Sequence, residues 1–268
     1  MASFSVVTNL SSANAQTNLL TNNMGLQQAI NRLSSGFRIN HASDDAAGLA
    51  VANGYRSQQQ VLTQGIRNAN DGLSSLQLKD GAMSNISSLL DRLSTLATES
   101  ASGASTVDRT ALNSEFSDVL SEIDREATVA GVDSGASTDF SVFVSNDSTN
   151  GVVSGTLAAA DTTTLGIHDS SIANADDAAS AVAAIANAVK TLGSAQATVG
   201  ALENRLQFAV SLAQSQLVNS QAAESRIRDA NVAEESANMT RYNILQQSGI
   251  AALAQANQSS SAILTLLR

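Results

Sequence analysis

The first hundred residues carry apolar side chains three and four positions apart, the spacing of one face of an α-helix. Residues 4–33 predict a first helix, whose other positions are mostly Asn, Gln, Ser and Thr. A second, long helix is predicted from Asp44 to about Ser100, with Ser43 as its cap and Asp44 and Asp45 in its first turn. Its heptad seam runs through Met83, Ile86, Leu90, Leu93 and Ala97.

The pattern changes in the middle of the chain. A loop of small residues at 101–106 precedes renewed helical spacing at Leu112, Phe116, Val119 and Ile123. Residues 140–144 then partly alternate in polarity, and a turn cluster at 146–151 separates them from Val152 and Val153. This pattern predicts a small β-hairpin region at about 138–168.

The remainder of the chain returns to helical spacing. A helix opens with Asp176 and Asp177 and carries an apolar seam as far as Leu217, and the last helix is predicted from about Arg228 to Leu267. The fold is therefore predicted to be mainly α. We expect a long antiparallel helical bundle or coiled coil of the N- and C-terminal segments, with the small β-hairpin as an insert.

Both ends of the chain lack acidic residues. All 24 of them lie between Asp44 and Glu235, and Arg32 and Arg38 are the only full charges within residues 1–43. Helices exposed to water usually carry charge on their outer face, so we expect the terminal helices to be covered by each other and by further copies. The expected self-assembly residues are Leu10, Leu20, Met24, Leu33, Arg38, Ile244, Leu245, Leu253, Leu266 and Leu267.

Composition excludes several classes of protein. The chain has no Pro, so long helices can continue uninterrupted, and no Cys, so disulfides and thiolate metal sites are excluded. A net charge of −10 argues against nucleic-acid binding. No apolar run approaches the roughly 18 residues that a membrane span needs. The N-terminus has no pattern of a cleaved signal peptide, so neither membrane insertion nor cleavage is expected.

The residues that enzymes use are scarce. The two histidines, His41 and His168, are expected in solvated loops, and the acid pairs at 44–45 and 176–177 are explained as helix starts. No glycine-rich phosphate loop is present. We therefore expect no enzyme activity, no catalytic residues, no cofactor and no metal ion.

Several stretches resemble those of bacterial flagellins, over about the first 130 and the last 70 residues. They are LSSGFRIN at 33–40, ASDDAAGLA at 42–50, GALENRL at 200–206, ESRIRDA at 224–230, ILQQSG at 244–249, LAQANQ at 253–258 and LTLLR at 264–268. Because only about 40 residues separate the helical regions, the resemblance is to a short flagellin without large variable outer domains.

The resemblance implies an architecture and a function. Residues 1–43 and 226–268 would form the D0 domain, which lines the filament channel, and residues 44–225 would form the D1 bundle with its hairpin. The chain would be a structural subunit that self-assembles into the extracellular flagellar filament for swimming motility, after export through the channel without a cleaved signal peptide. Its partners would be further copies of itself, hook-associated and cap proteins, an export chaperone and the export apparatus.

A binding site for an innate Toll-like receptor is implied by the same resemblance. Arg92 and Leu96 match the family's residues on a D1 helix, and Glu115 matches a Glu on the return helix. The competing interpretation is that these side chains are ordinary residues of the bundle with no role in binding. Three neighbouring positions depart from the family's Gln, Arg and Glu: Asp91, Ser94 and Thr95.

Two other functions remain open at this point. A hook–filament junction protein has related ends, and a coiled-coil adhesin or secretion-apparatus component has similar seams but needs no pair of charge-poor ends. The Ser- and Thr-rich stretch 134–164 is typical either of a glycosylated surface or of an ordinary loop. The Asn and Gln residues of the last helix, such as Gln255, suit either a channel lining or a solvated helix face.

Overall fold

The computed structural model describes residues 9–102, 108–134, 139–145, 147 and 151–266. These residues form, in chain order, α1 (Leu10–Ser35), α2 (Ala46–Ala101), α3 (Arg109–Ala130), β1 (Asp139–Phe143), β2 (Val152–Thr156), α4 (Ala175–Arg228) and α5 (Val232–Leu266). They divide into two compact units, one of residues 1–57 and 220–268 and one of residues 58–219. The mainly helical fold predicted from the sequence is confirmed.

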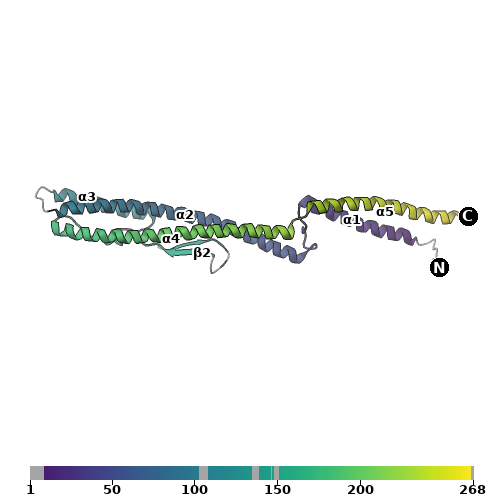
Figure 1. Ribbon diagram of the computed structural model, residues 1–268, viewed down its shortest axis with the longest axis horizontal. Coiled ribbons are helices and arrows are strands. Elements are labelled where there is room, and N and C mark those ends of the chain that lie inside the picture. Colours follow the sequence, from purple (N-terminus) through teal and green to yellow (C-terminus); the bar gives the residue numbers. More distant parts are fainter. Residues whose placement is uncertain (1–8, 103–107, 135–138, 146, 148–150, 267–268) are drawn as a thin grey trace. The chain divides into compact units, whose positions relative to one another are not determined.

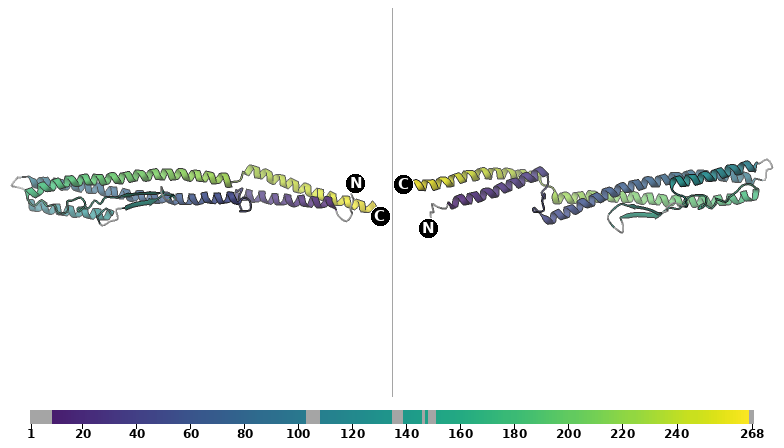
Figure 2. Two further views of the ribbon diagram at one scale, coloured as in Figure 1. Left: turned by 90° about the horizontal axis from the view of Figure 1, so that it is seen from below. Right: turned by 180° about the vertical axis from the view of Figure 1, so that it is seen from behind.

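The unit of residues 58–219 is a bundle of α3 with the greater parts of α2 and α4 (Figures 1 and 2). The seam predicted in α2 is confirmed, because all five of its residues are fully buried. Phe116 and Ile123 of α3 and Ile185, Leu192 and Val199 of α4 complete the same core. Burying such apolar surface contributes about 25 cal/mol per Å², so this unit has a continuous source of stability along its helices.

The predicted hairpin is present and packs on the bundle. β1 and β2 pair antiparallel, with Val142 opposite Val153, and both of these side chains are buried. A Cβ added at Gly72 of α2 would lie 2.7 Å from a methyl group of Val142, so the glycine lets the strand approach the helix closely. Most of the predicted turn at 146–151, and part of the Ser- and Thr-rich stretch 134–164, lie outside the described residues.

A folded connection joins β2 to α4. The Thr162 backbone N–H donates to Asp124 Oδ1 at 2.8 Å, and the Thr162 hydroxyl donates to Asp124 Oδ2 at 2.9 Å. These two bonds tie the connection to α3. His168 is exposed in this connection, as expected, with its Nδ1 atom 3.2 Å from Thr162 Oγ1.

Helix starts differ in detail from the sequence predictions. α2 begins at Ala46, and its cap is Asp45 rather than Ser43, because Asp45 Oδ1 accepts the Gly48 N–H at 2.9 Å. Asp44 instead closes the preceding turn, where its carboxylate accepts the backbone N–H groups of His41 and Asn40. Hydrogen bonds to the charged form stabilise it, and these two, that of His41 first, lower the pKa of Asp44.

The two terminal helices begin later in the chain than predicted. α1 begins at Leu10 with Asn9 as its cap, and residues 4–8 of the predicted helix lie outside the described residues. α5 begins at Val232 rather than at about Arg228, after a break at residues 229–231 that the absence of Pro and Gly concealed. Asn231 Oδ1 accepts the Ala233 N–H at 3.2 Å, so the asparagine caps the new helix.

Candidate assembly surface

α1 and α5 lie side by side and antiparallel (Figure 1). Asn9 Nδ2 donates to the Ala256 carbonyl at 2.9 Å near one end of the pair, and Arg32 Nη1 donates to Glu235 Oε1 at 3.1 Å near the other. Between them Gly25 faces the ring of Tyr242, where an added Cβ would lie 2.5 Å from the nearest ring carbon. The charge-poor ends of the chain therefore meet within one molecule, as the sequence predicted.

The pair buries little of its own apolar surface. Among the described side chains of α1, Leu26 and Ala29 are the buried ones. Ile30 on α1 and Ile250 on α5 are exposed large apolar residues. An isolated helix pair with so thin a seam gains little free energy from burial.

The predicted self-assembly residues mostly lie on the exposed faces of this pair and its turn. The exposed ones are Leu10, Leu20, Met24, Arg38, Ile244 and Leu245. Leu33 and Leu253 are half-buried. Leu266 lies in α5, in a stretch whose side chains are not described, and Leu267 lies outside the described residues. The exposed large apolar residues of the two helices form what we name the outer face, consisting of Leu10, Leu20, Met24, Ile30, Val232, Ile244, Leu245 and Ile250.

A small hydrogen-bonded cluster closes the base of the pair. Gly36 ends α1 in the left-handed region with φ of 74°, and its N–H donates to the Arg32 carbonyl at 2.9 Å. Phe37 then forms an isolated antiparallel bridge with Asp229, and the Arg228 guanidinium stacks over the Phe37 ring at 4.1 Å from its centroid. Both the turn after α1 and the break before α5 are held by this bridge.

Arg38, predicted as an assembly residue, belongs to the same cluster. Its backbone N–H donates to the Arg228 carbonyl at 2.7 Å, and its Nη2 donates to the Ile227 carbonyl at 2.9 Å. Its guanidinium therefore holds two segments of its own chain together. Arg38 was singled out because it lies in the stretch LSSGFRIN at 33–40, but the sequence did not predict its hydrogen-bond partners.

The Arg32–Glu235 ion pair was not predicted as a site. Glu235 is buried, whereas its neighbour Glu234 is exposed, and both lie in the first turn of α5. The sequence did contain a clue to this pair. Arg32 is one of two full charges in the first 43 residues, and Glu235 is the last acidic residue of the chain.

The residues matched to a receptor site fall into two groups. Arg92 and Glu115 form an ion pair across α2 and α3, with Nε 2.9 Å from Oε1 and side chains that are 51% and 45% exposed. Leu96 is only 1% exposed and belongs to the bundle core. Only the two charged side chains therefore present surface to a partner.

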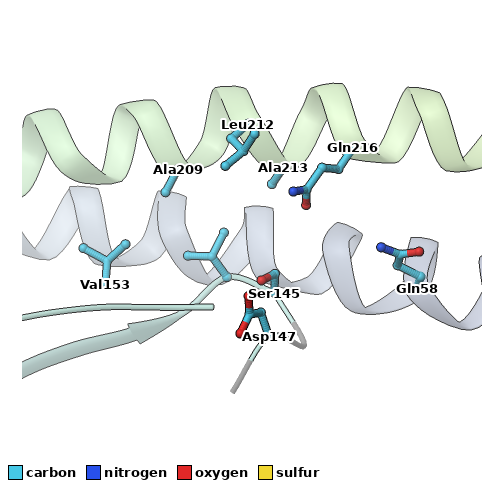
Figure 3. Close-up of a pocket in the computed structure, with 9 residues that line it drawn as sticks. Gln58, Ser145, Asp147, Val153, Ala209, Leu212, Ala213 and Gln216 are labelled. Carbon is cyan, nitrogen blue, oxygen red and sulfur yellow. The ribbon is translucent and has the colours of Figure 1, made fainter. Parts of the chain in front are cut away.

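One hollow of the bundle is drawn in Figure 3. It measures about 280 Å³, lies between α4 and the end of the hairpin, and mixes Val153 and Leu212 with Gln58, Asp147 and Gln216. No group of three or more His, Asp or Glu residues in the described part of the chain could hold a metal ion. Within the same part, none of the helices is both long enough and apolar enough to cross a membrane.

Comparison with known proteins assigns the family. The sequence model of the bacterial flagellin N-terminal helical region matches residues 6–134, and that of the C-terminal helical region matches residues 182–267. A flagellin of Halalkalibacterium halodurans is 38% identical, and the flagellar filament 33 kDa core protein of Treponema phagedenis is 36% identical. Each alignment covers 97% of this chain and 98% of the relative.

A flagellin of Listeria monocytogenes is 35% identical over 98% of this chain and 99% of its own length. The crystal structure of Bacillus cereus flagellin aligns with 59% of this chain and 94% of its own, at 28% identity and a TM-score of 0.49. The assignment rests on the sequence matches, which span both helical ends and nearly the full lengths of the relatives. The chain belongs to the bacterial flagellin family.

Proposed function

We propose that this chain is the structural subunit of a bacterial flagellar filament, in which neighbouring copies cover the outer face of each α1–α5 pair. The observation that carries the proposal is that this face places large apolar side chains in water, on helices almost free of charge. When a second copy covers these side chains, removing their apolar surface from water stabilises the assembly by about 25 cal/mol per Å².

The relatives favour a filament over a junction ring. The Treponema phagedenis relative is named a filament core protein, and it aligns over nearly its whole length. The flagellin family is a family of structural proteins. We therefore assign the chain to the filament rather than to the hook–filament junction, and its activity to assembly rather than to catalysis.

The finer assignments extend this proposal. The paired ends, residues 1–43 and 226–268, would form the inner D0 layer, and residues 44–225 the surrounding D1 bundle. Such a subunit meets hook-associated and cap proteins at the filament ends, and it needs an export chaperone and the export apparatus to reach them. It would travel through the channel to the cell exterior without loss of a signal peptide, with amides such as Gln255 facing the channel.

Limited proteolysis tests the central step. Chymotrypsin is expected to cut the monomer after Tyr242 and to leave the bundle intact, because the thin α1–α5 seam opens readily. Polymer formed by adding salt should resist cleavage at the same residue, with filaments visible by negative-stain microscopy. Phe116 is buried in the bundle and serves as the internal control, since it should be protected in both states. Equal resistance of monomer and polymer, or no polymer at all, would contradict the proposal.

Recognition by the innate Toll-like receptor is a separate proposal, carried by the exposed Arg92–Glu115 pair. Arginine is enriched among residues that dominate interfaces, so Arg92→Ala is expected to reduce receptor signalling by the monomer about tenfold. Arg125→Ala is the matched control, because Arg125 is also exposed and ion-paired, to Glu122. A reporter-cell assay measures both, and an unchanged response to Arg92→Ala would refute the contact.

A further inference from the structure

The sulfur of this chain is confined to its methionines. Because the sequence contains neither Cys nor Trp, methionine is its most readily oxidised type of side chain. Met83 is 0% exposed in the bundle core, and Met239 of α5 is half-buried. Met24 of α1 is 64% exposed, and Met1 lies outside the described residues. Among the methionines that the structure describes, Met24 is therefore the exposed one.

Met24 belongs to the outer face that neighbouring copies are proposed to cover. It lies one helical turn after Leu20, which is 65% exposed on the same side of α1. Methionine and leucine are both apolar and similar in volume, so the two side chains form one apolar stripe. Met24 is thus accessible in the monomer and, under the proposed function, covered in the polymer.

A polar hollow lies beside this side chain, between α1 and the turn that precedes α2. It measures about 260 Å³, and Met24, Gln27, Gln28 and Asn31 line it from α1. Residues three and four positions apart are neighbours on a helix surface, so the glutamines lie next to Met24. Each of these amides has two N–H donors, which a thioether accepts only weakly. The hollow therefore admits small polar molecules to Met24 and holds donors for an oxygen placed on its sulfur.

We propose that Met24 is a redox modification site, at which oxidation by hydrogen peroxide to methionine sulfoxide turns off assembly of the subunit. The sulfur attacks one oxygen of the peroxide, an S–O bond forms, and the O–O bond breaks. The other oxygen leaves as water with both protons, so the sulfur is oxidised and the peroxide is reduced without a further reactant. The inference rests on the proposed filament function and adds chemical control of it.

Oxidation reverses what Met24 contributes to a contact between copies. The thioether is apolar and adapts to irregular apolar surroundings, whereas the sulfoxide is polar and chiral. Burying a polar group away from its hydrogen-bond partners is unfavourable. The oxidised side chain therefore favours water and the amides of the hollow over cover by another copy. Met83 is protected in the core, so the bundle itself stays folded.

Peptide mass spectrometry after treatment with hydrogen peroxide tests the site. In the monomer we expect Met24 to be oxidised about tenfold faster than Met83 or more, with Met239 between them, because oxidation follows exposure. In polymer formed with salt, the rate at Met24 should fall toward that at Met83. Oxidation of Met24 no faster than that of Met83, or equally fast in monomer and polymer, would overturn the proposal.

Sedimentation of treated and untreated protein measures the effect on assembly. Peroxide treatment should raise the critical concentration of the unmodified chain about tenfold. Met24→Leu keeps an apolar side chain of similar volume, so it should polymerise before and after treatment alike. Met239→Leu is the matched control, which retains Met24 and should lose assembly on oxidation as the unmodified chain does. An equal loss in treated Met24→Leu would show that Met24 is not the controlling site.

Reversal gives a readout that needs no substitution. The two methionine sulfoxide reductases, one for each epimer, with dithiothreitol as the reductant, should restore assembly of the oxidised unmodified chain. Assembly that stays lost after reduction of Met24, or that peroxide never impaired, would overturn the proposal while the filament function stands. Failure of the untreated chain to polymerise would instead remove the filament proposal, and with it the control of assembly by Met24.

Discussion

Replacing Gly65 with alanine is expected to lower the free energy of unfolding of the bundle by about 2 kcal/mol. A Cβ at this position of α2 would overlap the Val144 carbonyl oxygen and lie 2.8 Å from the Val144 Cα. Val144 cannot easily withdraw, since its N–H donates to the Gly151 carbonyl at 2.7 Å. Overpacking of this kind costs about 3 kcal/mol, and the better helix propensity of alanine offsets about 1 kcal/mol. Urea denaturation followed by circular dichroism measures the change.

Gly200→Ala is the matched control for Gly65→Ala. Gly200 also lies inside a long helix of the same unit, but a Cβ there would meet nothing within 4 Å. This variant should gain up to about 1 kcal/mol from helix propensity. If Gly65→Ala were as stable as Gly200→Ala, the hairpin would not pack on α2 as described.

Replacing Glu235 with alanine is expected to abolish assembly at concentrations where the unmodified chain polymerises. The substitution leaves the Arg32 guanidinium, whose Nε already lacks a hydrogen-bond partner, without its counter-ion. Breaking a fully buried pair costs about 3–5 kcal/mol. Because the Arg32 and Glu235 side chains are 26% and 11% exposed, we expect about 2 kcal/mol here. A thin helix pair cannot absorb that loss, so the critical concentration should rise more than tenfold.

Glu234→Ala controls for the change in charge, because the two glutamates are adjacent in the first turn of α5 and only Glu235 is buried. It should polymerise nearly as well as the unmodified chain. Replacing Arg32 and Glu235 together with methionine should restore assembly in part, because no unpaired charge is then left. Critical concentrations by sedimentation compare all three variants. A Glu235→Ala protein that assembles normally would show that the ion pair contributes nothing.

The long seam of α2 was predictable residue by residue, and so was most of the α4 seam, although Val189 stands at a predicted seam position and is 40% exposed. Their apolar positions repeat at heptad spacing over many turns, without Pro to interrupt them. The pairing of the two chain ends was predictable for a different reason. Both terminal helices are poor in charge, so each is expected to pack against another surface rather than face water. Boundaries were less predictable. The cap at Asp45 and the break before Val232 depend on which polar side chain accepts a particular N–H, and several neighbouring residues are chemically able to do so.

Other features had no local signal at all. In the sequence, Gly65 and Gly72 are simply residues of low helix propensity. The structure shows that the hairpin region packs against both positions, where a Cβ would collide with it. Leu96 was expected at a receptor contact from the family resemblance alone, yet it lies in the core, one turn after the core residue Leu93. The compact units divide the chain at 57/58 and 219/220. α2 and α4 continue through both divisions, so no turn or change of composition marks them.

Local sequence alone determined the helical class of this protein, its buried seams, its charge-poor ends and its family. Each of these depends on spacing or composition, which a linear chain already contains. Only the tertiary structure decided which apolar stripe of α1 faces α5 and which faces outward. Leu26 and Leu20 are equally apolar, and their burial differs because the partner helix, more than 200 residues away, packs against one of them. The Arg32–Glu235 pair, 203 residues apart, was decided in the same way.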